Sequence, residues 1–407
     1  MTAVTSSATS AAPRMSIGIL AAISSSHLLN DLLQFLLPAL YPLLKETYGL
    51  SYLQIGLLTL AQQITACILQ PLFGLYGDLR PKPYWLALSL TLVGLGVFLL
   101  ATANGFGLLF LASMVMGTGS ALFHPEASRL ARLASGGRLG FAQSLFQVGG
   151  NAGTALGPLA AALVLLPMGQ GTTVWFVLVA AAGVLLLTWV GRWYAEHQRQ
   201  LALKPPVALA KPELSRKRLI VAFAVIGALL LSKYVYIETL KSYYAFFLIE
   251  KFALPPEAAQ LYLFLFLGAV AVGTFFGGPI GDRFGRLAVV WVSILGALPF
   301  TLLLPYLDLI GTAIMSVLAG LVLASAFSAI VVYAQELVPG KVGMVAGFVF
   351  GFAFGIGALG AAVVGAVADV VGMVTVFKFC AFLPVLGVLT VFLPRSSELH
   401  PRARELA

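Results

Sequence analysis

Four polar side chains lie close together in an otherwise apolar stretch, SSSHLLNDLLQFLLPALYPLL, which begins at Ser24. They are His27, Asn30, Asp31 and Gln34. At about 100° per residue, an α-helix would place all four within an arc of roughly 100°. His27 and Asp31 are four residues apart, so an imidazole and a carboxylate would share one helix face and could bind or relay a proton.

A second set of titratable side chains lies in the stretch SALFHPEASRLAR. His124 and Glu126 flank Pro125, and Arg129 follows Glu126 at the i+3 position. We place this set near the cytoplasmic boundary of the membrane, where Glu126 and Arg129 could form a gating salt bridge between helices. A role of His124 and Glu126 in a proton relay fits the pattern equally well.

One lysine, Lys233, lies within the apolar stretch LLLSKYVYIETLKSYYAFF. At 1.5 Å per residue from the start of each apolar segment, Asp31 and Lys233 both lie roughly 22 Å deep, near the middle of a membrane. A lysine at that depth could pair with Asp31 or bind an anionic substrate. Five further polar side chains are candidates for the same substrate site: Asn30, Gln34, Gln147, Asn151 and Tyr234.

The elements that hold these side chains must cross a lipid bilayer. The chain has 407 residues, 60% hydrophobic and only 10% charged, whereas soluble globular proteins carry about 25% charged residues. The net charge of +9 does not indicate nucleic-acid binding, because the basic residues lie in short loops. A helix needs ~20 apolar residues to span the hydrocarbon core. This criterion predicts an all-α membrane protein with twelve transmembrane helices, at 17–45, 52–77, 83–103, 107–129, 138–166, 172–196, 217–250, 258–281, 287–305, 310–336, 341–369 and 372–394.

The chain also repeats itself. GLYGDLRPKP from Gly74 and GPIGDRFGRL from Gly278 are offset by 204 residues, and the stretches from Gly137 and Gly340 are offset by 203. Such agreement indicates an internal duplication. Six helices per copy give both copies the same orientation, which predicts two parallel six-helix halves. We expect an N-terminal tail, the first half, a polar linker, the second half and a C-terminal tail, at 1–15, 16–196, 197–216, 217–394 and 395–407.

The distribution of basic residues predicts the orientation in the membrane. All but five of the 24 Lys and Arg lie in the two tails or after every second span. The five exceptions are Lys45, Lys233, Lys241, Lys251 and Lys378. Because basic residues collect on the cytoplasmic side, we expect both termini to be cytoplasmic.

The loop motifs carry a family resemblance. Two six-helix halves with GGPIGDRFGR between spans 8 and 9 resemble the major facilitator superfamily of secondary transporters. The resemblance implies that Asp282, Arg283 and Arg286 brace neighbouring helices in one conformational state. Asp78 and Arg80 occupy the corresponding place in the first half, but GDLRPKP lacks the following Gly-Arg, so weaker bracing is expected there.

Longer stretches carry a closer resemblance. SHLLND, FHPEASRLARLASGGRLG, SLFQVGGN, SKYVY and YAQELVPGKVGMV resemble the fosmidomycin resistance family, efflux carriers of Gram-negative bacteria, along nearly the whole chain. The resemblance implies a monomeric antiporter of the bacterial inner membrane that uses protons to expel a small anionic phosphonate antibiotic. It implies no cofactor, metal or catalytic residue.

Other functional classes fit the sequence less well. A primary pump would need a nucleotide-binding motif, and no G-x-x-x-x-G-K-[ST] occurs. His27 and Asp31 could serve an intramembrane enzyme, but no nucleophile or cofactor motif accompanies them. The sequence contains no ring of like charges of the kind that lines a channel. Proton-coupled import of a small organic anion stays open, since the residues themselves do not determine the direction of transport.

Overall fold

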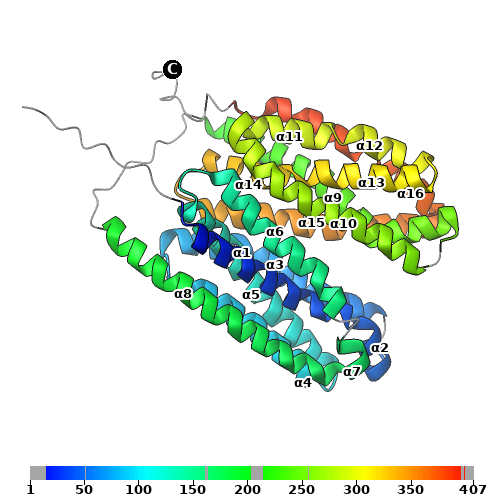
Figure 1. Ribbon diagram of the computed structural model, residues 1–407, viewed down its shortest axis with the longest axis horizontal. Helices are drawn as coiled ribbons and strands as arrows, with labels where there is room; N and C mark the ends of the chain where they lie inside the picture. Colours follow the sequence, from blue (N-terminus) through cyan, green and yellow to red (C-terminus); the bar gives the residue numbers. More distant parts are fainter. Residues whose placement is uncertain are drawn as a thin grey trace, which may run out of the picture.

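The computed structural model describes residues 15–50, 52–160, 164–202, 214–254, 256–395 and Glu398. Most of the expected tails and linker, 1–15, 395–407 and 197–216, lie outside these residues. Every regular element within the described ranges is a helix, as the apolar composition predicts. Figure 1 shows the helices as two elongated bundles lying side by side.

The first bundle contains the helices drawn from blue to green in Figure 1. They are α1 (Ile17–Ala39), α2 (Tyr41–Tyr48), α3 (Tyr52–Leu79), α4 (Trp85–Thr102), α5 (Phe106–Ala134), α6 (Leu139–Ala160), α7 (Leu166–Met168), the 3-10 helix η2 (Gln170–Trp175) and α8 (Phe176–Ala202).

The second bundle contains the helices drawn from green to red. They are α9 (Arg216–Phe252), α10 (Pro256–Phe284), α11 (Arg286–Leu295), α12 (Leu298–Leu303), η3 (Leu304–Tyr306), α13 (Leu309–Ala324), α14 (Ala326–Leu337), α15 (Val342–Val371), α16 (Met373–Cys380) and η4 (Leu383–Phe392).

Helix length and composition fit a membrane protein. Eleven helical stretches among the described residues are long and apolar enough to cross a bilayer. The remaining expected span corresponds to α6, whose 22 residues include Gln143, Gln147 and Asn151 together with several glycines. These residues lower its hydropathy, because amides are costly in lipid. The expected span that is not among the eleven therefore carries candidate substrate ligands.

Several expected spans are interrupted rather than continuous. The stretch 17–45 divides at Leu40, after Pro38, and 287–305 divides at Gly296, before Pro299. Proline lacks the backbone N–H that would continue the hydrogen-bond ladder, which explains breaks of this kind. Other prolines do not end their helices, because α3, α5 and α10 continue through Pro71, Pro125 and Pro279.

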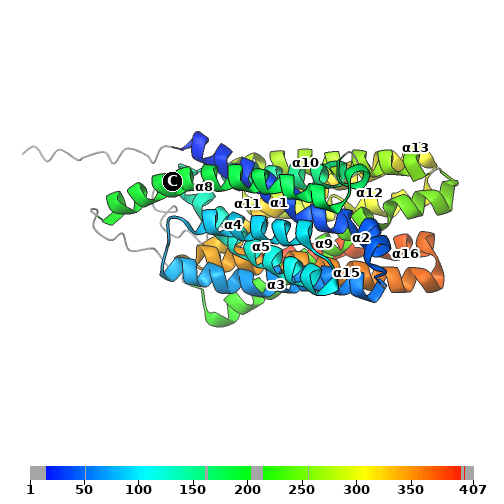
Figure 2. The ribbon, with the colours of Figure 1, turned by 90° about the horizontal axis from the view of Figure 1, so that it is seen from below.

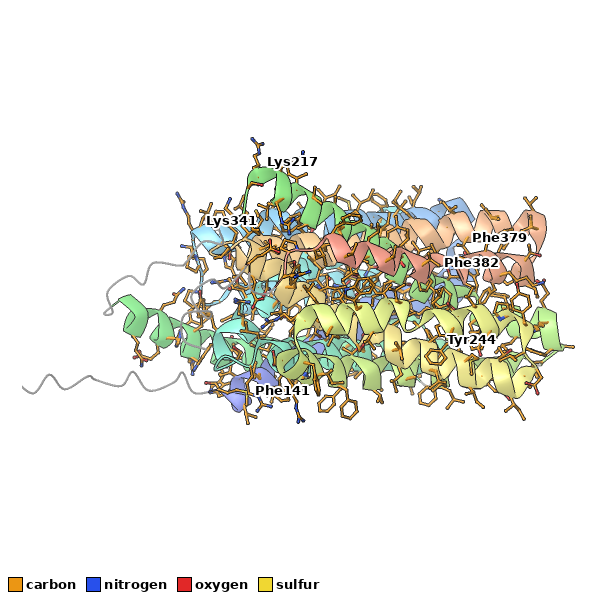
Figure 3. All side chains as sticks on the ribbon, turned by 90° about the horizontal axis from the view of Figure 1, so that it is seen from above. Phe141, Lys217, Tyr244, Lys341, Phe379 and Phe382 are labelled. Carbon is orange, nitrogen blue, oxygen red and sulfur yellow. The ribbon has the colours of Figure 1, made fainter. Side chains whose placement is uncertain are left out.

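The structure has one end at which the chain enters and leaves the bundles, which we call the terminal end. Helices α1 and α9 begin there and α8 and η4 end there, as Figures 1 and 2 both show. Figure 3 places Phe141, Lys217 and Lys341 at this end and Phe379 and Phe382 toward the other. The two bundles contact each other most extensively where α3 packs on α15 and α6 packs on α10.

Candidate functional site

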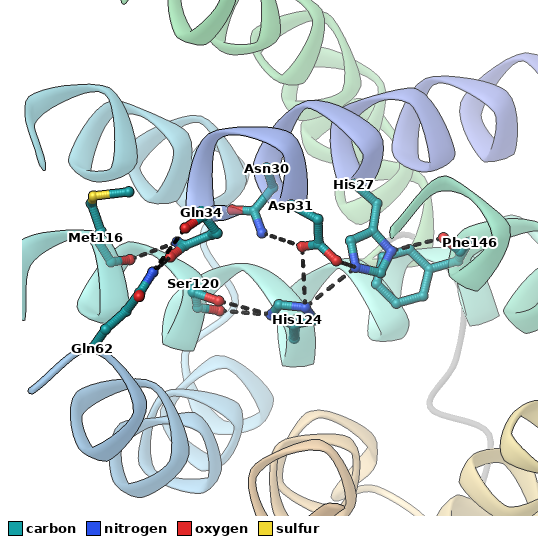
Figure 4. A network of polar contacts seen from close by, with 9 residues as sticks. All are labelled: His27, Asn30, Asp31, Gln34, Gln62, Met116, Ser120, His124 and Phe146. Atoms are coloured by element: carbon teal, nitrogen blue, oxygen red, sulfur yellow. Dashed lines mark hydrogen bonds and ion pairs between the residues drawn. The ribbon is translucent and has the colours of Figure 1, made fainter. Parts of the chain in front are cut away.

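Three titratable side chains from α1 and α5 meet between the helices and form what we call the His–Asp–His cluster. His27 Nε2 lies 3.4 Å from the Asp31 carboxylate and 3.3 Å from His124 Nε2, and His124 Nε2 lies 3.8 Å from Asp31. Both imidazoles are almost fully buried. Figure 4 shows the three side chains converging on one point.

Backbone carbonyls determine which nitrogen of each imidazole carries a proton. His27 Nδ1 lies 2.8 Å from the Phe146 carbonyl, and His124 Nδ1 lies 3.0 Å from the Ser120 carbonyl. A carbonyl only accepts hydrogen bonds, so we assign the proton to Nδ1 in both rings; the Ser120 hydroxyl, 3.3 Å from His124 Nδ1, can accept from the same nitrogen. In the neutral rings both Nε2 atoms are then lone-pair acceptors, and they face each other and the carboxylate. Three acceptors around one point create a site for a proton.

The same three residues are the group of described side chains whose spacing would also suit a metal ion. Their ligand atoms all lie within 4.8 Å of one another. The rings are held tightly, because His27 stacks on Phe146 with 4.1 Å between ring centroids and His124 contacts Phe350 and Phe354 of α15. A side chain at Gly150 would overlap the His27 ring. The cluster is therefore rigid on the α6 side.

The other polar residues of the α1 face also bond to the protein. Asn30 donates to Asp31 at 2.9 Å, while its own side-chain oxygen is bonded by no described residue. Gln34 donates to the Met116 carbonyl at 2.8 Å and accepts from Gln62 at 2.5 Å, which ties α1 to α5 and α3. Gln34 lines the cavity described next, with its amide engaged, whereas Asn30 is fully buried and positions the Asp31 carboxylate.

A cavity of about 450 Å³ lies between the two bundles and is bordered by the cluster on one side. Opposite, α9 contributes Lys233, which is 1% exposed. Among the described residues none accepts a hydrogen bond from its ammonium, which lies 5.2 Å from the Phe327 ring centroid and 5.5 Å from that of Tyr234. The other cavity lysine, Lys241, is paired with Glu238 at 2.7 Å.

The expected ion pair between Asp31 and Lys233 is absent from the described part of the chain. Both residues line the same cavity, as their similar depths predict, but each has other neighbours. Asp31 lies beside the imidazoles and Lys233 beside aromatic rings. A buried ammonium without an acceptor is costly, so this position favours the binding of an anion from outside the chain.

Amides line the cavity on the first bundle. Asn151 donates to Thr274 of α10 at 3.1 Å, which joins the two bundles. The side-chain oxygen of Gln147 and both polar atoms of Gln70 are buried, and no described residue bonds them. Sequence reasoning missed Gln70. The spacing of Gln62, Gln63 and Gln70 along one apolar helix was the available signal.

Glu126 and Arg129 lie apart from the His–Asp–His cluster. Arg129 binds Glu126 with two hydrogen bonds and donates to the Tyr194 hydroxyl of α8 at 2.7 Å. Residues two positions apart on a helix point about 200° from each other, so Glu126 cannot share the surroundings of His124. His124 joins Asp31 at the cavity, whereas the position of Glu126 and Arg129 near the cytoplasmic boundary stays a prediction.

Two aspartates join the bundles at the terminal end. Asp78 at the end of α3 accepts hydrogen bonds from the backbone N–H groups of Gly343 and Met344, both at 2.9 Å, at the start of α15. Asp282 at the end of α10 accepts from Gly140 and Phe141, at 2.8 and 2.9 Å, at the start of α6. Each carboxylate thus caps the positive end of a helix in the other bundle.

The two aspartates differ in their arginines. Arg286 lies 4.0 Å from Asp282 and 3.1 Å from Glu336, whereas Arg80 and Arg283 are exposed and no described arginine lies within 4.0 Å of Asp78. The weaker bracing expected at Asp78 stays a prediction that this difference supports, while the capping bonds of the two aspartates are equal in number and nearly equal in length.

Comparisons with known proteins agree with this architecture. The family model described as Major Facilitator Superfamily matches residues 23–247 and 239–407. The chain is 51% identical over 381 residues to the Fosmidomycin resistance protein of Escherichia coli (strain K12), covering 94% of each chain. It is 41% identical over 388 residues to the Uncharacterized MFS-type transporter YfnC of Bacillus subtilis (strain 168), again covering 94% of each.

Solved structures share the fold at low sequence identity. FucP, a Major Facilitator Superfamily transporter solved in the outward conformation, aligns with a TM-score of 0.71 at 17% identity, covering 93% of this chain and 99% of FucP. The human organic anion transporter MFSD10 (TETRAN) aligns with a TM-score of 0.73 at 16% identity, covering 92% of this chain and 99% of that one.

Proposed function

The chain belongs to the Major Facilitator Superfamily, and from that premise we propose that it is a proton-coupled antiporter of the bacterial inner membrane that expels fosmidomycin and so confers resistance. The predicted family and all-helical transporter fold are confirmed, and the chain is a transporter rather than an enzyme. The substrate rests on the relative that is 51% identical.

One observation carries the mechanism. A single cavity joins a site that can hold a proton, on the first bundle, to a buried ammonium without a described acceptor, on the second. A carrier that exchanges protons for an anion needs both kinds of group within reach of one substrate.

Exchange requires that proton and substrate compete. The His27 and His124 Nε2 atoms and the Asp31 carboxylate all border the cavity, and their lone pairs can accept either a proton or a hydrogen bond from a substrate N–H or O–H group. Both cannot occupy the point between them. A substrate held by Lys233 would therefore release the proton, and a returning proton would release the substrate.

We further propose that the terminal end faces the cytoplasm. The accumulation of Lys and Arg after every second span supports this orientation. With Asp78 and Asp282 capping α15 and α6, the structure then represents the state closed to the cytoplasm.

Inverted membrane vesicles with a pH-sensitive dye in an acidified lumen test the proposal. Adding fosmidomycin outside should raise the luminal pH, because each drug molecule that enters releases protons. Asp31→Asn should abolish the response, whereas Asp308→Asn, which alters a carboxylate that caps α13 outside the cavity, should preserve it. No response in vesicles that contain folded protein would exclude fosmidomycin. A response that survives Asp31→Asn would exclude the cluster as the coupling site.

Electrostatics favours one second candidate. A proton on the cluster makes the cavity less negative, which by itself would help an anion bind at Lys233 rather than compete with it. Proton and anion would then move together, as in an importer. The same vesicles distinguish the two, since co-transport would lower the luminal pH on addition of the drug.

A further inference from the structure

We infer that the cavity contains a second substrate subsite, formed by Gln70 and Gln147, that binds a neutral group carrying both a hydrogen-bond donor and an acceptor. The inference rests on the proposed anion transport and specifies its substrate class. Substrates would be bipartite, with an anionic group at Lys233 and a neutral amide-like group at the two glutamines.

Gln70 carries the first part of the argument. It is 0% exposed, lies on α3 at the cavity lining, and has neither its amide nitrogen nor its amide oxygen bonded by any described residue. Exchanging the two ends of the amide would leave the same deficit. Buried polar groups are nearly always hydrogen-bonded, so an amide lacking both kinds of partner is best explained by a ligand that supplies them.

A second glutamine of the cavity shows the same deficit. The backbone of α3 at Gln70 lies against Gly347 of α15, so the two bundles are in close contact at this point. Gln147 of α6, 6% exposed, likewise has its side-chain oxygen unbonded. Gln34 and Gln62 show the contrast, because they bond each other at 2.5 Å.

The unbonded groups define the chemistry of the ligand. Lys233 offers a charged donor, Gln70 a neutral donor and an acceptor, and Gln147 an acceptor. A simple anion would satisfy only the ammonium. A ligand with an amide, hydroxamate or hydroxyl group beyond its anionic group would satisfy all three residues.

The placement also suits the proposed transport cycle. Gln70 and Gln147 belong to the first bundle and Lys233 to the second. A bipartite ligand would contact both bundles at once, whereas a simple anion would be held mainly by one. The neutral group would also provide the donor that competes with the proton at the neighbouring imidazoles.

Two probes with equal charge and chain length test the subsite in the purified full-length protein. One is 3-acetamidopropylphosphonate and the other hexylphosphonate, which lacks the amide. We expect the amide probe to bind at least roughly tenfold more tightly by calorimetry, the worth of one or two buried hydrogen bonds. Gln70→Met should remove this preference, and Gln63→Met, a matched change at another cavity residue of α3, should keep it.

Size-exclusion chromatography checks that each variant is folded. A second variant, Gln70→Asn, keeps the amide but shortens the side chain by one carbon, and it should also lose the preference for the amide probe. Equal affinity for the two probes, or a preference that survives both Gln70 variants, would overturn the subsite. In that case Lys233→Met would still weaken the binding of both probes if the anion site is correct. Binding of neither probe would overturn the anion site and the subsite together.

Discussion

The two walls of the cavity satisfy their polar groups in opposite ways. On the first bundle, His27, Asp31 and His124 contact one another and are oriented by backbone carbonyls. On the second bundle, Lys233 lies among aromatic rings without a described acceptor. The His–Asp–His cluster lacks only a proton, whereas Lys233 lacks an anion. The difference assigns proton binding to a network and anion binding to a single residue.

If that contrast holds, loss of the single residue has the largest effect. Lys233→Met should weaken fosmidomycin binding roughly 30- to 100-fold, because one charge-assisted hydrogen bond contributes about 2–3 kcal/mol and Met replaces the ammonium with an apolar side chain. Calorimetry on the purified protein measures this change. Lys378→Met is the control, since Lys378 lies over Tyr306 and outside the cavity. An unchanged affinity would remove Lys233 from the substrate site.

The network on the first bundle should tolerate single losses better. His27→Gln and His124→Gln should each slow drug-dependent proton movement about tenfold, since the remaining imidazole and Asp31 still bind a proton. The double variant should be less impaired than the product of the two, because residues in contact couple by ~0.5–3 kcal/mol. Initial rates in inverted vesicles measure both effects. His197→Gln on α8 is the control, and independent, multiplicative losses would contradict a shared proton.

The smallest effects are expected at the terminal end, where the two bundles contribute equally. Asp78→Asn and Asp282→Asn should each shift the equilibrium toward opening by only a few-fold, since a charged helix cap contributes about 0.5–2 kcal/mol. To measure this shift, Gln70 is replaced by cysteine in a background with Cys67 and Cys380 replaced by alanine. In the Asp78→Asn and Asp282→Asn variants this cysteine should react faster with an impermeant maleimide added to inverted vesicles than it does when both aspartates are present.

An equal increase of the labelling rate in the Asp78→Asn and Asp282→Asn variants would match the equal capping bonds of the two aspartates. A much larger effect of Asp282→Asn would show that Arg286 and Glu336 dominate the closure instead. Asp308→Asn should leave the labelling rate unchanged.

Periodic features of the structure were predictable from the sequence. The helix period placed His27 and Asp31 in contact, and the apolar spans indicated an all-helical membrane fold. The repeat offset also reappears in space. Asp78 and Asp282 differ by 282 − 78 = 204, and the glycines that they cap, Gly140 and Gly343, differ by 343 − 140 = 203. The helix period and the repeat can be predicted because the sequence of each helix contains them.

Contacts between helices were harder to predict. The sequence suggested one proton relay for His124 and Glu126, but helix geometry directs them to opposite sides and brings His124 to α1. It left open whether Lys233 pairs with Asp31 or binds an anionic substrate, because opposite charges at similar depth allow both. Their separation depends on the width of a cavity, which no spacing along the chain encodes. Gln70 was missed because an isolated amide in an apolar helix resembles a packing residue.

Four glycines at the terminal end have a practical consequence. A side chain at Gly74 or Gly343 would overlap the other, and the same holds for Gly140 and Gly278. The nearest obstacles to a methyl group all belong to the opposite bundle, so they move away once the bundles separate. Alanine at these positions therefore penalises one conformation alone. The four exchanges, singly and combined, provide a graded set of conformationally biased carriers for selecting state-specific antibodies and inhibitors, with the cavity itself unaltered.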